Sequence, residues 1–158
     1  MKYAQGTSIP VDRSVAELRA LVQRYGAQGF GYCEEHEPHL RRAMIAFRFD
    51  ARSVRMLLPL PALDSPEVAR TRQGYERTEG QKLEALAAED RRRWRALVLV
   101  VKAKLEAVAS GISSLEREFL ADLVLPNGNV LHDEIAPRLA RWREGGPAVP
   151  LIPERASP

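Results

Sequence analysis

The stretch from Glu89 to Gly111, EDRRRWRALVLVVKAKLEAVASG, constrains the fold more than any other part of the sequence. Its apolar residues recur at steps of three and four, which places one set of them on a single helix face. Leu99 and Val100 widen the apolar surface, so the helix needs cover from more than one side. We therefore expect a helix over residues 81–110 at the centre of a single core. Its inward set comprises Trp94, Leu97, Val98, Val101, Leu105 and Val108.

Bulk composition is typical of one globular domain. The chain has 158 residues, of which 45% are apolar and 28% are charged, and this length can bury a real core. No apolar run is long enough to span a bilayer, and no leader pattern precedes the first helix. The single cysteine, Cys33, excludes an internal disulfide and suits a reducing compartment. We therefore expect a cytoplasmic protein with no membrane association.

The positive charge of the chain is carried almost entirely by arginine. The 24 basic residues include four lysines, which leaves 20 arginines. One interpretation is phosphate recognition, because a guanidinium group matches phosphate oxygens with two hydrogen bonds. The other is a GC-rich genome or a thermophilic host, which the scarcity of asparagine also favours.

The N-terminal part predicts an arm followed by a helix. Residues 3–11 are typical of an extended arm or edge strand, because Pro10 limits how they pair. Ser14 and Glu17 match the capping box, in which each side chain satisfies a free backbone N–H, so a helix is expected to begin there. Its apolar stripe comprises Val15, Leu18, Leu21, Val22 and Tyr25.

Three short apolar runs then predict a β-sheet. They lie near residues 30–32, 43–49 and 53–58, and an exposed loop is expected over 34–42. The tight spacing of the runs favours an antiparallel meander. Alternation places one set of side chains toward the helices, namely Ala43, Ile45, Phe47, Phe49, Val54, Met56 and Leu58.

Shorter elements are expected after the long helix. Ser113 with Glu116 repeats the capping pattern, and Asn127-Gly128 favours a small hairpin because this pair suits the primed turns. A last helix is expected over residues 132–143. Its inward residues are expected to be Ile135, Leu139 and Trp142.

Together these patterns predict an α+β fold. We expect a small antiparallel β-sheet with a capped N-terminal helix and a helical C-terminal half packed on one face. Residues 1–144 would form a single domain. Within it, residues 59–80 contain three prolines and two glycines and are expected to be a mobile connector. Residues 145–158 are expected to be an extended or disordered tail.

Two groups of residues have the composition of catalytic or metal sites without completing one. Cys33, His36 and His39 have ligand-like spacing, but no second Cys or His pair completes a structural zinc site. Converging carboxylates would suit a two-metal nuclease, although acidic residues are favoured anyway where a helix begins. We therefore assign no catalytic residue, metal ligand or cofactor, and expect binding rather than catalysis. The carboxylates of the nuclease alternative are Glu118, Asp122 and Asp133.

The uncovered face of the predicted sheet is the most suggestive surface. Strand alternation places Arg48 and Arg55 on this face, and Tyr32 is expected to share it. Single-stranded nucleic acid is bound by cations that pair with phosphates and by aromatic rings that stack on bases. An ordinary solvated sheet face is the alternative interpretation. With residues from a strand end and from the connector, the candidate nucleic-acid-binding set is Tyr32, Arg48, Arg52, Arg55, Arg70 and Arg72.

Three segments carry a family resemblance: GTSIPVDRSVAELRALVQRYGAQGFGY, IAFRFDARSVRMLLPLP and RRRWRALVLVVKAKLEAVASGISSLEREFLADLVLPNG. Together they resemble a widespread family of small, functionally uncharacterised proteins encoded by bacteriophages and prophages. The block WRAL-x-L-V-x-KAKLEAV is the most specific part, and the resemblance covers most of residues 5–135. It transfers no activity, but it implies a phage gene product that acts inside the host cell.

The leading functional hypothesis is an accessory protein of phage DNA metabolism that binds single-stranded nucleic acid through the sheet face. The second is a protein-interaction module for a host or phage enzyme, which would use Leu99 and Val100 and the tail residues Leu151 and Ile152. A metal-dependent nuclease is the third. The chain could also form a homo-oligomer.

Overall fold

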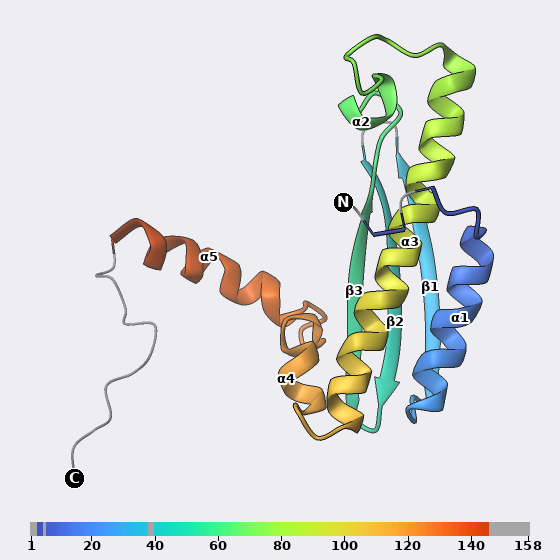
Figure 1. Cartoon of the computed structure of the whole chain (residues 1–158). Helices are drawn as coiled ribbons and strands as arrows, with labels where there is room; N and C mark the ends of the chain where they lie inside the picture. The colour runs from blue at the N-terminus through green and yellow to red at the C-terminus, as the bar shows by residue number, and fades with distance from the viewer. Residues whose placement is uncertain (1–2, 5, 38–39, 146–158) are drawn as a thin grey trace.

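The computed structural model describes residues 3–4, 6–37 and 40–145. Its three strands form one antiparallel sheet in the order β1-β2-β3, and α1 and α3 lie across one face of that sheet (Figure 1). The predicted α+β class and the predicted meander are confirmed. The elements are α1 (Val11–Arg24), β1 (Gly29–Glu37), β2 (Leu40–Phe49), β3 (Arg52–Leu60), α2 (Pro66–Ala69), α3 (Glu79–Ala109), α4 (Leu115–Phe119), the 3-10 helix η1 (Leu120–Asp122) and α5 (Leu131–Gly145).

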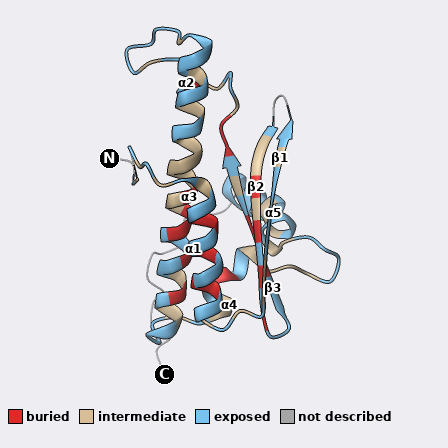
Figure 2. Ribbon diagram, turned by 90° about the vertical axis from the view of Figure 1, so that its right-hand side faces the viewer, coloured by how far each residue is buried: buried red, intermediate tan, exposed pale blue. Residues whose placement is uncertain are grey.

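The core lies between the sheet and the two covering helices (Figure 2). β2 alternates buried and exposed residues as predicted, and Leu58 of β3 is half-buried against the same core. Each fully buried large apolar side chain contributes about 1.5–3 kcal/mol. The buried apolar residues of this core are Val15, Leu18, Leu21, Val22, Ala43, Ile45, Phe47, Phe49, Val54, Met56, Leu60, Trp94, Leu97, Val98, Val101, Leu105 and Phe119.

The first hairpin is longer than predicted. β1 continues to Glu37 and β2 begins at Leu40, so most of the segment expected to be a loop is paired strand. Glu35 lies opposite Arg42 and forms an ion pair with it across the strands. Such opposite-charge pairs stabilise a sheet without any apolar alternation. The apolar pattern alone therefore missed this part of the hairpin.

The segment 59–80 carries regular structure at several points. β3 runs through Pro59, which is tolerated because β3 is an edge strand. α2 follows, and Arg70 then forms an isolated bridge with Glu76. α3 begins two residues before the predicted start, behind a capping box formed by Thr78 and Gln81. The mobility of this segment stays a prediction.

The predicted capping box at Ser14 is wrong. α1 begins at Val11 with Pro10 as its N-cap, and no side chain caps it. Ser14 lies inside the helix, is fully buried, and its hydroxyl has no hydrogen-bond partner among the residues that the structure describes. The pattern S-x-x-E occurs here by coincidence of position, one turn after the true start. Ser114 rather than Ser113 similarly caps α4.

Replacing Ser14 by alanine is expected to raise the free energy of unfolding by about 1 kcal/mol, because it removes a buried unsatisfied hydroxyl and improves helix propensity. A capping serine would instead lose about 1 kcal/mol on this change. Urea unfolding followed by circular dichroism measures the sign. Thr78→Ala is the control, since Thr78 accepts a capping bond from the N–H of Gln81 and should lose stability. Destabilisation by Ser14→Ala would contradict the buried position.

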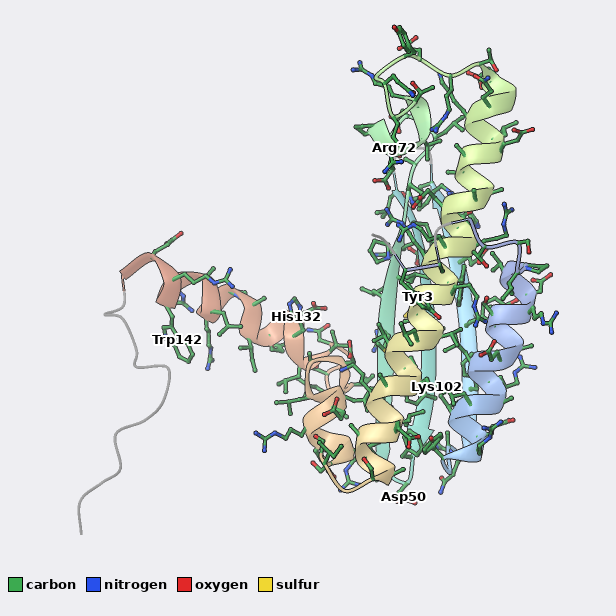
Figure 3. All side chains as sticks on the ribbon, viewed as in Figure 1. Tyr3, Asp50, Arg72, Lys102, His132 and Trp142 are labelled. Carbon is green, nitrogen blue, oxygen red and sulfur yellow. The ribbon has the colours of Figure 1, made fainter. Side chains whose placement is uncertain are left out.

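The last helix differs most from expectation. None of the described residues of α5 is buried: Leu139 and Trp142, which are predicted to point inward, are exposed, and Ile135 is half-buried. Its main packing partner is η1, and it runs away from the sheet (Figure 1). Trp142 is 71% exposed and lies on the far part of the helix (Figure 3). The helix therefore leaves the body with its apolar side uncovered.

Across the described part of the chain, no helix combines the length and the apolar character that crossing a membrane requires. The predicted tail beyond residue 145 lies outside the described residues.

Candidate interaction surfaces

The strand register defines the sheet face that α1 and α3 leave uncovered, here called the open face. Residues paired directly across antiparallel strands point to the same side of the sheet, and Ile45 and Phe47 point into the core. Every second residue on each strand therefore faces the other way. The open face comprises Gly29, Gly31, Cys33, Glu35, Glu37, Leu40, Arg42, Met44, Ala46, Arg48, Ser53, Arg55, Leu57 and Pro59.

An apolar row crosses the middle of the open face. Cys33 pairs with Met44, and Met44 pairs with Leu57, so the row spans all three strands. Leu57 is 51% exposed and Cys33 is also exposed. A sheet face that meets water usually carries polar residues at such positions. The apolar row is therefore an unusual feature, and the search for charged and aromatic residues in the sequence did not detect it.

Two of the predicted nucleic-acid-binding residues lie on the open face. Arg48 is exposed, and its side chain has no partner among the described residues. Arg55 donates a hydrogen bond to the carbonyl of Gly128, which lies in the turn before α5. One of the two guanidinium groups is thus available to a ligand, and the other is engaged within the chain.

Tyr32 and Arg52 lie on the other side of the sheet, and the expectation that Tyr32 shares the open face is wrong. Tyr32 pairs with Ile45, and its ring meets Trp94 edge-on with centroids 6.2 Å apart. Arg52 pairs with Phe49 and forms an ion pair of 2.6 Å with a carboxylate of α4. Both side chains therefore contact the helical layer.

Arg70 and Arg72 lie at the opposite end of the sheet from Arg48. Figure 3 labels Arg72 near α2 and Asp50 at the β2–β3 turn, which are at opposite ends of the molecule. β3 joins these two ends, and its nine residues span roughly 30 Å. The six predicted residues thus do not form one compact site.

The histidine and cysteine group does not converge. Cys33 lies on the open face, whereas His36 is an odd number of residues away and points to the other face. There its ring accepts a hydrogen bond from the Nε of Arg41. His39 lies outside the described residues. Among the residues that are described, no three Cys, His, Asp or Glu side chains are placed to hold a metal ion.

The carboxylates of the nuclease hypothesis likewise form no group of three that could hold a metal ion among the described residues. Burial raises the pKa of Asp122 above its usual range, although the positive charges of Lys104 and His132 oppose the shift. Lys104 also donates to the backbone carbonyl of Glu118 and lies 5.2 Å from the centre of the Phe119 ring. This lysine is thus part of the packing around α4.

The uncovered apolar side of α5, here called the α5 stripe, consists of Ile135, Leu139 and Trp142. Exposure increases along it, because Ile135 is half-buried near η1 whereas Leu139 and Trp142 are exposed. The base of the helix is held in place by Glu134. Its carboxylate accepts hydrogen bonds of 2.8 Å and 2.9 Å from the side-chain amides of Asn127 and Asn129, which lower the pKa of Glu134.

The structure describes two of the four residues that the sequence suggests for protein interaction. Leu99 and Val100 are exposed on α3, which agrees with the apolar excess predicted for that helix. Leu151 and Ile152 lie outside the described residues. The α5 stripe was visible in the sequence as a helical pattern, but it was assigned to the core.

The fold and these surfaces define an α+β protein whose sheet is covered by helices on one face and which exposes apolar residues on the other face and on α5. Comparisons of the chain with protein-family models, with curated proteins and with solved structures give no match. Its function is therefore inferred from the surfaces themselves.

Proposed function

We propose that this protein is an interaction module that docks on another protein chain through α5. One observation carries the proposal: Ile135, Leu139 and Trp142 are spaced i, i+4 and i+7 on a helix that the described residues of its own chain leave uncovered. This is the anchor spacing of helices that bind in an apolar groove of a partner. Tryptophan is also the residue type that most often dominates the energy of an interface.

The resemblance to phage-encoded proteins supports a setting for this activity. In that setting the protein acts inside a bacterial host cell, and the chain on which α5 docks is a host or phage protein. The proposal needs no catalytic group, because docking of a preformed helix can by itself recruit or block a partner.

Replacing Trp142 by glutamate is expected to weaken partner binding at least about tenfold, because a hot-spot tryptophan is lost and a charge enters the contact. The measurement is the recovery of bound proteins by the immobilised chain from a bacterial lysate, followed by an affinity titration of the main partner. Circular dichroism should be unchanged, since Trp142 is 71% exposed. Leu83→Glu, at an exposed apolar residue of α3 outside the proposed contact, is the matched control. Equal recovery by wild type and Trp142→Glu would contradict the proposal.

A second candidate function, binding of single-stranded nucleic acid, is favoured by Arg48. Its guanidinium group is exposed and unpartnered among the described residues, and Gly29 and Ser53 on either side of it leave room for a phosphate. Arg55 lies on the same face, one row away. These two residues, rather than the full set of six, form the candidate contact.

Under this second candidate, fluorescence anisotropy of a labelled single-stranded oligonucleotide should show affinity that falls steeply with salt. Arg48→Ala combined with Arg55→Ala should reduce the slope of log affinity against log salt by about 1 to 1.5, since each lost phosphate contact on a single strand removes about 0.7. Arg13→Ala on α1 is the control, and a duplex serves for comparison. An unchanged slope would remove these residues from the site, and no binding at low salt would remove the function.

A further inference from the structure

We propose that the chain on which α5 docks is a second copy of this protein, whose open face receives the α5 stripe across the apolar row. This inference rests on the proposed function, because it names the partner of the same helix. It would produce a symmetric dimer in which each α5 covers the sheet of the other chain.

The base of α5 is fixed so that the helix does not cover its own sheet. Val124 donates its N–H to the carbonyl of Ser53 on β3, and Leu131 donates to the carbonyl of Leu123. The turn between them is held by the hydrogen bond from Arg55 to Gly128. From this anchored base α5 runs away from the sheet (Figure 1). Within residues 3–4, 6–37 and 40–145, nothing therefore covers the apolar row or the α5 stripe.

The two surfaces match in shape and polarity. The apolar row is flanked on one side by Gly31 and Ala46, whose small side chains form a shallow strip along which a helix can lie closely. On the opposite face of the same sheet, α1 and α3 already lie in this way. A sheet that carries apolar residues on both faces buries them against a helical layer on each side. Met44, in the middle of the row, has the flexible side chain that adapts to an incoming ring.

The available area indicates how tight the pair would be. Three strands of nine or ten residues present a face of about 14 Å by 30 Å. The fifteen residues of α5 form a helix about 22 Å long and about 10 Å wide. A helix of this size covers about 220 Å² of a sheet face, so each chain would bury about 440 Å², made up of its own helix and the part of its sheet that lies under the partner's helix. This is about half of the ~800 Å² per partner of a standard specific interface, so the dimer is expected to be weak and to depend on concentration.

The arrangement also closes on itself. In a two-fold dimer the same pair of patches is used twice, because the helix of one chain meets the sheet of the other and the reverse holds as well. In such a dimer, neither the open face nor the α5 stripe remains free to bind a third chain. A closed dimer is therefore expected rather than a fibre.

Sedimentation velocity of the full chain between about 1 and 100 µM tests the inference. Wild type should be a dimer at the upper concentrations. Trp142→Glu and Leu57→Glu should each weaken the dimer at least about tenfold, because each variant damages both halves of its own interface. Leu83→Glu, at an exposed apolar residue of α3 that belongs to neither surface, should leave the dimer intact.

An equimolar mixture of the two variants provides the decisive measurement. Trp142→Glu keeps an intact open face and Leu57→Glu keeps an intact α5, so the mixture restores one undamaged half of the interface. Mixed dimers should form more tightly than the homodimers of either variant. A dimer based on contact between two α5 helices, or between two sheets, would show no such recovery.

Cys33 supplies an independent readout, because it is the only cysteine and lies in the apolar row. Its rate of alkylation by iodoacetamide should fall several-fold when wild type is concentrated from 1 to 100 µM. The rate should not change with concentration for Trp142→Glu. Protection of Cys33 by an added oligonucleotide in a monomeric chain would assign the open face to nucleic acid and overturn the inference.

The remaining outcomes separate this inference from the proposed function. A wild type that stays monomeric at 100 µM overturns the dimer, as does a dimer that Leu57→Glu leaves intact or a mixture that does not recover. If Trp142→Glu nevertheless loses a foreign partner, the proposed function survives without the dimer. If Trp142→Glu changes neither self-association nor partner binding, both fail.

Discussion

Replacing Trp94 by alanine is expected to lower the free energy of unfolding by about 3–5 kcal/mol. Trp94 is fully buried on α3, at the point where the helix meets the sheet, and its ring contacts Tyr32 of β1 edge-on. Alanine would leave a cavity that the sheet and helix cannot close, because both are held by their own hydrogen bonds. Natural domains are stable by about 5–15 kcal/mol in total, so a large share would be lost. Urea unfolding followed by circular dichroism at 222 nm measures the change.

Trp94→Phe is the matched control for this prediction. The indole Nε1 is buried without a hydrogen-bond partner among the described residues. Phenylalanine keeps an aromatic ring in the core but is smaller than tryptophan. Removing the unsatisfied N–H stabilises the protein, and this gain partly offsets the stability lost with the smaller side chain. We expect a cost below about 1.5 kcal/mol. If phenylalanine were as damaging as alanine, the indole N–H would have to be bonded, which contradicts the structure.

The second large effect is expected at Asp90. Its carboxylate accepts two hydrogen bonds from the guanidinium of Arg41, of 2.7 Å and 3.2 Å, and the two side chains are only 17% and 14% exposed. Arg41 also donates to the carbonyl of Pro61. This cluster ties α3 to the start of β2 and the end of β3. Asp90→Ala would leave a largely buried guanidinium without its counter-charge, which should cost about 3 kcal/mol.

The ion pair between Arg52 and Glu116 is the control for Asp90→Ala. Its length of 2.6 Å is similar to that of the first pair, but its side chains are 47% and 46% exposed. Because Arg52 is exposed, water can solvate its guanidinium when the carboxylate is removed, so Glu116→Ala should cost less than about 1 kcal/mol of stability. Both variants are measured by the same urea unfolding. Equal losses would show that burial does not determine how much these ion pairs contribute to the free energy of unfolding.

Periodicity in the sequence was enough to predict the centre of the fold. The buried residues of α3 and the inward residues of β2 repeat at the spacing that burial imposes, so the core contains every predicted residue of these two elements except Val108, which is half-buried. Opposite-charge pairing across the first hairpin has no such periodicity. A prediction from apolar periodicity therefore makes the strands of the first hairpin too short.

The extent of the first hairpin also decides on which face of the sheet Tyr32 lies. A shift of one residue in strand register moves a side chain from one sheet face to the other. Glu37 pairs with Leu40, and the same register pairs Tyr32 with Ile45. Because the turn was expected over a longer segment, its register could not be derived, and Tyr32 was placed on the wrong face.

The α5 stripe illustrates a different limit. An apolar stripe indicates that something covers the helix, but it does not indicate which chain does so. Ile135 and Trp142 follow the same spacing as the buried residues of α3, and only the three-dimensional structure distinguishes them. The candidate site thus depends on geometry that periodicity cannot supply.

The unequal burial along α3 has a consequence for how this molecule opens. The helix has 31 residues, yet its buried residues begin only at Trp94, and the first fifteen residues contain none. Backbone amides near Leu83 can therefore exchange with solvent through local fraying, while those near Val101 are released only when the whole domain unfolds. We therefore expect this one continuous helix to open in two steps, and the connector is attached to the part that opens first.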